Sequence, residues 1–232
     1  MLAKIDTIER EIFARRDQKK ASVLRKKVNT HLQIAGLSRA DRLNILRNIN
    51  EYVAAEDDEF MWLNLLQELW ESPWFESRLI ILQLLFLQHH RVDTNIWDAL
   101  DLWTDDIDTW VLADWLGHIR GIVNKKAPYL SMRMAAWLRS EKSLRRRSAL
   151  VSLTYLSPEN GELSLILKPQ ETLAFLEPIV SEKHGEVIPA LAWLLNFIKT
   201  LSPEAFGIYY ENIQHDLHPS VRDFLTIPAA HS

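Results

Sequence analysis

Apolar residues recur at intervals of three and four positions along most of the chain, which is the spacing of one face of an α-helix. Alternating runs of β-branched residues, which would indicate half-buried strands, are almost absent, and the chain contains only six glycines. The pattern therefore predicts an all-α protein with a strand content near zero.

The periodic segments are short and are separated by turn signals such as Gly36, Ser72-Pro73 and Ser202-Pro203. Pro178 should split the helix that contains it, whereas Pro189 is tolerable within a first helical turn. The longest irregular connection is expected over 157–169. We expect roughly a dozen helices, over residues 5–17, 19–35, 38–53, 60–71, 76–90, 95–103, 105–121, 129–139, 143–156, 171–182, 187–200 and 203–213.

Pairs of these segments recur about every 40 residues, which is the size class of HEAT and armadillo repeats. The segment 76–90 is apolar nearly all round, which indicates an interior helix. The sequence thus predicts an α-solenoid of about six HEAT-like helix pairs with a concave binding surface, folded as a single domain over residues 1–232.

The segment 105–121 carries the most informative pattern, and Asp105 to Asp108 are expected to cap its helix. Trp110 and Asp114 fall off its apolar stripe and stand at i and i+4, so their side chains are neighbours. Ala113, Gly117 and Gly121 share their side of the helix. Either this small-residue face lies open beside Trp110 and Asp114, or the glycines admit a closely packed neighbour and Trp110 fills the core.

Charge is distributed unevenly around a net value of −4. Residues 51–108 are strongly acidic, whereas residues 1–50 and 120–150 are basic. The basic segments could line a polyanion-binding groove, or they could form an ordinary solvated surface. At least one of the consecutive arginines 145–147 should point into such a groove, because three helical positions fan over about 200°.

The cysteine content, the N-terminal sequence and the missing motifs exclude several classes of protein. The chain has no cysteine, and its N-terminus is charged rather than apolar, so we expect a cytoplasmic protein without disulfides or thiolate zinc sites. No apolar run reaches the ~20 residues that span a bilayer. Standard nucleotide-binding and hydrolase motifs are absent, and His89-His90 lacks a second ligand pair, so no metal or cofactor is expected. Except for Trp193, whose placement is open, tryptophans on apolar stripes should be core residues: Trp62, Trp70, Trp74, Trp97, Trp103 and Trp115.

Four motifs in order give the chain a recognisable pattern. They are W-x3-D at Trp110 and Asp114, W-x2-S at Trp137 and Ser140 followed by RSAL at 147–150, ALAWLLNFIKTLSPE around Trp193, and HLQIAGLSRADR near the N-terminus. Together they resemble the DNA alkylation repair enzymes, the AlkD-like HEAT-repeat DNA glycosylases, over nearly the whole chain.

The resemblance implies an enzyme that excises cationic alkylated purines from double-stranded DNA and leaves the lesion exposed to solvent. We expect this enzyme to be a monomer. It carries catalytic roles onto Asp114, Trp110, Trp193 and Arg147, with Arg147 holding a backbone phosphate. Further DNA contacts are expected from the basic segments: Lys26, Lys27, Lys125, Lys126, Arg145 and Arg146.

The chain departs from the family pattern at several positions, namely Lys27, Thr109, Leu144, Pro189 and Asn196. Lost stacking and phosphate contacts there predict weaker DNA binding or a changed substrate. One alternative function is a non-catalytic HEAT-repeat scaffold that binds a protein or undamaged nucleic acid, and another is a purely structural relative that has lost DNA binding.

Overall fold

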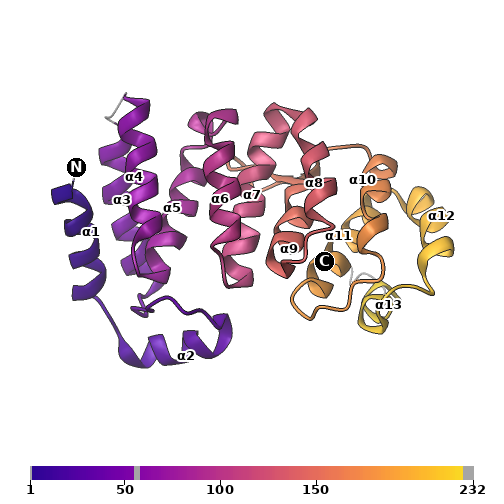
Figure 1. Cartoon of the computed structure of the whole chain (residues 1–232), viewed down its shortest axis with the longest axis horizontal. Coiled ribbons are helices and arrows are strands. Elements are labelled where there is room, and N and C mark those ends of the chain that lie inside the picture. Colours follow the sequence, from indigo (N-terminus) through magenta and orange to yellow (C-terminus); the bar gives the residue numbers. More distant parts are fainter. Residues whose placement is uncertain (1, 55–57, 227–232) are drawn as a thin grey trace. The chain divides into compact units, whose positions relative to one another are not determined.

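The computed structural model describes residues 2–54 and 58–226 and is mainly helical (Figure 1). This confirms the predicted all-α, solenoid-like fold class. The helices of the described residues are α1 (Leu2–Ala14), α2 (Gln18–Val28), α3 (Arg39–Ala54), α4 (Glu59–Glu71), α5 (Phe75–Leu87), α6 (Trp97–Asp105), α7 (Trp110–Lys126), α8 (Met132–Trp137), α9 (Ser143–Ser152), α10 (Pro169–Phe175), α11 (Ile188–Leu201), α12 (Pro203–Ile213) and α13 (Pro219–Thr226).

The chain divides into two compact units, Met1–Trp115 and Leu116–Ser232. The division falls inside α7, whose first six residues belong to the first unit. The expectation of one domain over residues 1–232 stays a prediction.

The first unit is built around α5, which α3 and α4 pack against. Residues 75–82 are all buried, as expected for an interior helix, whereas Leu87 at the end of the helix is 49% exposed. Of the six tryptophans expected in the core, Trp62, Trp70, Trp97 and Trp103 are buried. Trp74 and Trp115 are only half-buried, so the prediction is wrong in degree for these two.

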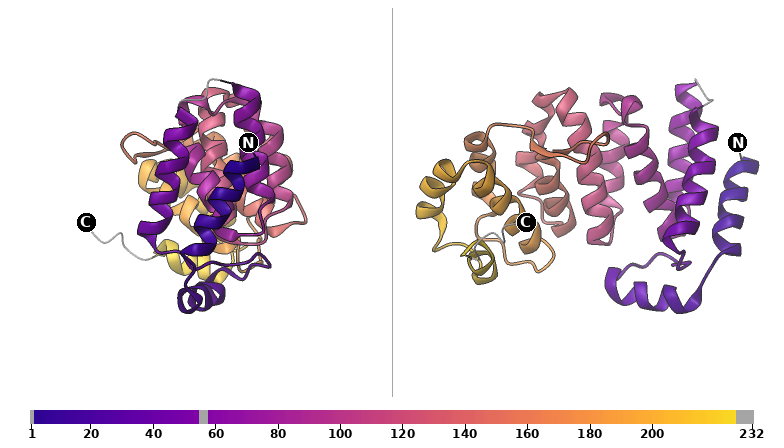
Figure 2. Two further views of the ribbon diagram at one scale, coloured as in Figure 1. Left: turned by 90° about the vertical axis from the view of Figure 1, so that its left-hand side faces the viewer. Right: turned by 180° about the vertical axis from the view of Figure 1, so that it is seen from behind.

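Helix α2 ends earlier than its pattern predicts, at Val28 rather than near Gly36. Asn29 takes a left-handed conformation, with φ 43°, and closes the helix. Figures 1 and 2 show that α2 lies across the ends of the helices α3, α4 and α5 and is not parallel to them. Apart from Val28, none of its residues is buried.

The extended segment 29–38, which we call the strap, leads from α2 to α3. The buried carboxylate of Glu76 accepts hydrogen bonds from the backbone N–H groups of Ala35 and Gly36, at 3.0 Å and 2.8 Å. Gly36 has φ 75°, and a Cβ there would lie 2.3 Å from the carbonyl oxygen of Asp17. Only glycine therefore fits this close approach.

In the second unit, α9 packs against α8 and α11, and α11 packs against α12 and α13. Proline acts as predicted: α10 stops before Pro178, which lies in the 3-10 turn Glu177–Ile179, and Pro189 lies in the first turn of α11. The prediction of a wholly irregular connection over 157–169 is wrong. An antiparallel hairpin joins β1 (Thr154–Leu156) to β2 (Leu163–Leu165), and it pairs Tyr155 with Ser164.

Candidate functional site

The start of α7 displays an aromatic side chain, as its sequence pattern predicts. Trp110 is the first residue of the helix and is 40% exposed. Its indole Nε1 donates a hydrogen bond to the backbone carbonyl of Lys27, at 3.5 Å. Asp114 follows one turn later and is half-buried. An indole face and a carboxylate thus stand together on one helix.

The glycines of α7 do not lie on an open surface. A Cβ at Gly117 would lie 2.5 Å from Cβ of Val151, and one at Gly121 would lie 2.1 Å from the carbonyl oxygen of Thr154. Ala113 is fully buried. The interpretation of the small-residue face as an open surface is therefore wrong, because the two glycines allow neighbouring residues to pack closely against α7. The alternative interpretation, in which the glycines admit a packed neighbour and Trp110 fills the core, holds only for the glycines, because Trp110 is exposed.

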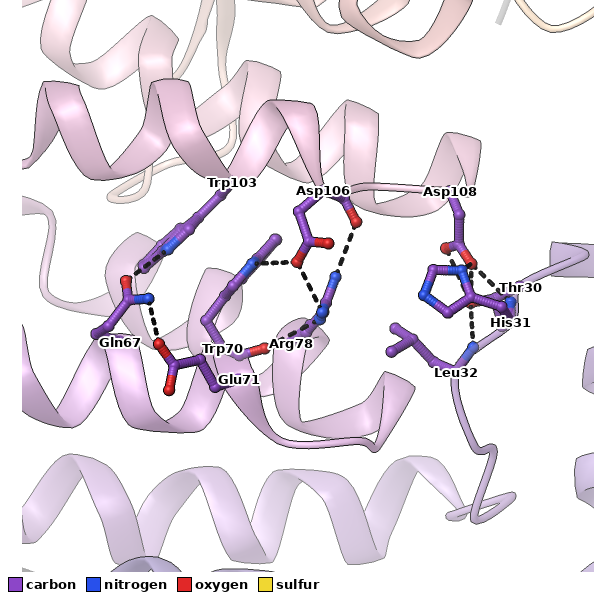
Figure 3. A network of polar contacts seen from close by, with 10 residues as sticks. All are labelled: Thr30, His31, Leu32, Gln67, Trp70, Glu71, Arg78, Trp103, Asp106 and Asp108. Atoms are coloured by element: carbon purple, nitrogen blue, oxygen red, sulfur yellow. Dashed lines mark hydrogen bonds and ion pairs between the residues drawn. The ribbon is translucent and has the colours of Figure 1, made fainter.

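The connection between α6 and α7 is fixed by side chains from distant parts of the first unit (Figure 3). The buried guanidinium of Arg78 donates to the carbonyl of Asp106 at 3.0 Å and pairs with its carboxylate at 2.8 Å. The indole of Trp70 donates to the same carboxylate at 3.1 Å. These contacts hold the chain directly before Trp110.

Asp108 binds the strap instead of capping α7 as predicted (Figure 3). Its carboxylate accepts hydrogen bonds from the Thr30 hydroxyl, at 2.7 Å, and from the backbone N–H of His31, at 2.6 Å. It also pairs with Nδ1 of His31 at 2.5 Å. The first helical hydrogen bond of α7 is accepted by the Thr109 carbonyl. Sequence spacing gave no signal for this contact, because Thr30 and Asp108 are separated by 78 positions.

The lysines predicted to bind DNA are exposed. Lys26 and Lys27 lie in the last turn of α2, and Lys125 and Lys126 in the last turn of α7. The ammonium of Lys125 lies 5.6 Å from the ring centroid of Tyr155 on β1.

Arg147 and Trp193 lie in the second unit, on α9 and α11, whereas Trp110 and Asp114 lie in the first. Arg147 is 9% exposed, and its guanidinium donates to the carbonyl oxygen of Glu186 at 2.5 Å. Trp193 is half-buried and stacks on Phe197 with ring centroids 6.3 Å apart. The packing of α9 on α11 therefore brings Arg147 to the segment that leads into the helix of Trp193.

The two arginines before Arg147 are held by contacts within the second unit. Arg146 forms two hydrogen bonds with the Glu182 carboxylate, at 2.6 Å and 3.0 Å. Burial raises the pKa of Glu182, but hydrogen bonds from Arg146 and from the backbone of His184 outweigh it and lower the pKa overall. The guanidinium of Arg145 lies 4.6 Å from the ring centroid of Trp137. Their roles as DNA contacts stay predictions.

The described residues contain no group of three or more His, Cys, Asp or Glu side chains placed to hold a metal ion. None of the described helices is long and apolar enough to cross a membrane.

Comparisons with known proteins agree with this architecture. The family model for the DNA alkylation repair enzyme matches residues 8–215. The fold is similar to the structure of a predicted DNA alkylation repair enzyme from Enterococcus faecalis, with a TM-score of 0.76 and 12% sequence identity, over 94% of this chain and 98% of that chain. No curated protein matches the sequence.

Proposed function

Because the chain belongs to the DNA alkylation repair enzyme family, which gives it a role in DNA repair, we propose that it is a DNA glycosylase for cationic alkylated purines. Its substrates would be 3-methyladenine and 7-methylguanine in duplex DNA, released by hydrolysis of the N-glycosidic bond. We propose that it acts as a monomer in the cytoplasm, without a metal or other cofactor.

The observation that carries this proposal is the pairing of Trp110 and Asp114 at the start of α7. Trp110 keeps 40% of its surface exposed although its indole nitrogen is anchored on Lys27. An exposed indole presents an aromatic face, and such a face attracts a cationic base by about 0.5–2 kcal/mol.

The chemistry of the lesion explains why a carboxylate beside that indole is sufficient. A purine alkylated at N3 or N7 is already positively charged, so it can leave without protonation by a general acid. As the bond between the base and C1′ breaks, positive charge develops on the sugar. The carboxylate of Asp114 would stabilise that charge until water adds to C1′ and releases a proton to solvent.

The exposed lysines support a role in holding DNA. Lys26, Lys27, Lys125 and Lys126 have ammonium groups on exposed side chains, which suits contacts to backbone phosphates. Arg147 and Trp193 would act as the family resemblance implies, through a phosphate contact and a second aromatic face. For Arg147 this requires the guanidinium to bind phosphate while it also holds the Glu186 carbonyl.

The proposal is tested by incubating the protein in excess with methylated duplex DNA and separating the products by chromatography. We expect free 7-methylguanine or 3-methyladenine together with an equal amount of abasic sites. Duplex binding without base release at any enzyme excess would instead favour the non-catalytic scaffold. Excision of neutral lesions at the same rate would contradict the proposed mechanism even for an active glycosylase.

A further inference from the structure

His31 is an exposed histidine whose orientation is fixed by a carboxylate. Its side chain is 67% exposed, whereas that of Asp108 is 19% exposed. The contact between Nδ1 and Asp108 is 2.5 Å long. A carboxylate can only accept, so Nδ1 must carry the proton of this hydrogen bond. The second ring nitrogen, Nε2, has no hydrogen-bond partner among the described residues.

The backbone around His31 is held from both sides. Asp108 accepts from the backbone N–H of His31 and from the Thr30 hydroxyl (Figure 3). The guanidinium of Arg25 donates to the carbonyl oxygens of Thr30 and Leu32, at 3.2 Å and 3.3 Å. A side chain on a backbone fixed in this way loses little further freedom when it binds a ligand.

His31 also lies near residues of the proposed DNA-binding surface. The Lys27 carbonyl, four positions earlier, accepts from the Trp110 indole, and Asp108 precedes Trp110 by two positions. The imidazole is therefore tied to the same two elements, the end of α2 and the start of α7, that present Lys27 and Trp110.

Protonation changes what this pair can bind. With neutral His31, the pair carries the single negative charge of Asp108 and repels an anion. With protonated His31, the pair is neutral, and Nε2 gains a proton that it can donate while Nδ1 stays on Asp108. Only the protonated pair can therefore donate a charge-assisted hydrogen bond to a phosphate oxygen.

We infer that His31 is a proton-linked contact for a DNA backbone phosphate, an assignment that rests on the proposed function. DNA binding then takes up a proton at this site, and affinity falls as the pH rises. The charged side chains nearest to this pair along the sequence are Arg25, Lys26 and Lys27 at the end of α2 and Asp105 and Asp106 before α7. The Asp106 carboxylate is engaged by Arg78 and Trp70.

The test is the affinity for an undamaged duplex at pH 6 and pH 8, measured by fluorescence anisotropy at constant salt for the wild type and His31→Gln. Glutamine keeps a donor but cannot take up a proton. For the wild type we expect binding about five- to tenfold weaker at pH 8 than at pH 6, as suits the loss of one charge-assisted hydrogen bond. His31→Gln should lose this part of the pH dependence.

His215→Gln is the matched control, because His215 is exposed and has no carboxylate partner among the described residues. It should bind like the wild type at both pH values. Asp108→Asn removes the acceptor that orients the imidazole, so the effect of His31→Gln on the pH dependence should be smaller in the Asp108→Asn background than in the wild type. Thermal unfolding of each variant reports whether the strap stays folded.

The outcomes separate this inference from the proposed function. If His31→Gln keeps the wild-type pH dependence while the wild type releases methylated bases, the inference is wrong and the glycosylase proposal stands. If the wild type binds no duplex at either pH, both are wrong.

Discussion

Three carboxylates in the first unit each join parts of the chain that are far apart in sequence. Glu76 accepts from the strap, Asp106 from Arg78 and Trp70, and Asp108 from Thr30 and His31. These residues lie in a strongly acidic segment of the sequence, where they look like ordinary surface charges. Helical periodicity could identify Trp110 and Asp114 as off-stripe residues, but it carries no information on partners 28 to 78 positions away.

Trp110 should act mainly on selectivity, because cation-π attraction depends on the charge of the lesion. Trp110→Ala should lower the ratio of excision rates for 7-methylguanine and a neutral lesion by about 2- to 30-fold, which corresponds to 0.5–2 kcal/mol. Competition between the two lesions in one reaction measures this ratio. Trp110→Phe keeps an aromatic face and should retain more of it; an unchanged ratio in Trp110→Ala would argue against stacking of the base there.

Glu182 should contribute to stability in a defined pH range. Its pKa is lowered in the folded state, so its contribution is complete above the unfolded value of about 4.5 and is lost as the pH falls through the folded value. We expect Glu182→Gln to unfold more easily at pH 7 by about 1–3 kcal/mol. Urea titrations from pH 7 to pH 3 should show this difference shrinking only below about pH 4.5.

Glu211→Gln is the matched control for Glu182→Gln, since Glu211 is an exposed residue of α12. Its free energy of unfolding should stay within about 0.5 kcal/mol of the wild type. Equal effects of the two substitutions would mean that the pairing of Glu182 with Arg146 adds nothing to stability.

At the scale of elements, long periodic segments were predictable and their ends were not. Helix α5 and the effects of Pro178 and Pro189 follow directly from pattern and backbone sterics. The end of α2 depends on the left-handed Asn29, and the hairpin at 154–165 depends on strand pairing. Helix α13, over Pro219–Thr226, lies beyond the last predicted helix. It is held by packing against α11, which a local pattern cannot reveal.

Substituting alanine for a glycine should lower the stability of the protein in α7 and raise it in α12. Gly117→Ala places a Cβ 2.5 Å from Val151, so the packing of α7 on α9 should be weakened by about 1–3 kcal/mol or more. In α12, a Cβ at Gly207 would meet nothing within 4 Å, so Gly207→Ala should stabilise the protein by up to about 1 kcal/mol. Thermal unfolding of both variants decides the matter; a stabilised Gly117→Ala would contradict the close packing.

At the scale of the whole molecule, the order of motifs along the chain was more informative than any one of them. Trp110, Asp114, Arg147 and Trp193 belong to a pattern that spans both units, and the family match over residues 8–215 confirms the resemblance that they carry. The net charge of −4 alone would argue against nucleic acid. The separation of basic from acidic segments would allow an acidic protein to bind DNA through its basic segments.

Duplex binding should therefore depend steeply on salt. Each neutralised phosphate releases counterion, so log K should fall with log salt by roughly 0.9 per contact. Replacing Lys26 and Lys27 by alanine, or Lys125 and Lys126, should lower this slope by up to about 1.8 in each double variant. Binding titrations at several salt concentrations measure the slope, and a flat dependence in the wild type would contradict phosphate binding.

The central claim is that Asp114 stabilises the sugar cation while a charged base departs. The most direct measurement is single-turnover release of 7-methylguanine by Asp114→Asn and by the wild type, together with the affinity of each for the same duplex. Asparagine keeps the shape of the side chain and removes its charge, so we predict that most of the rate is lost while DNA binds equally well or more tightly. An unchanged rate of release in Asp114→Asn would contradict the account.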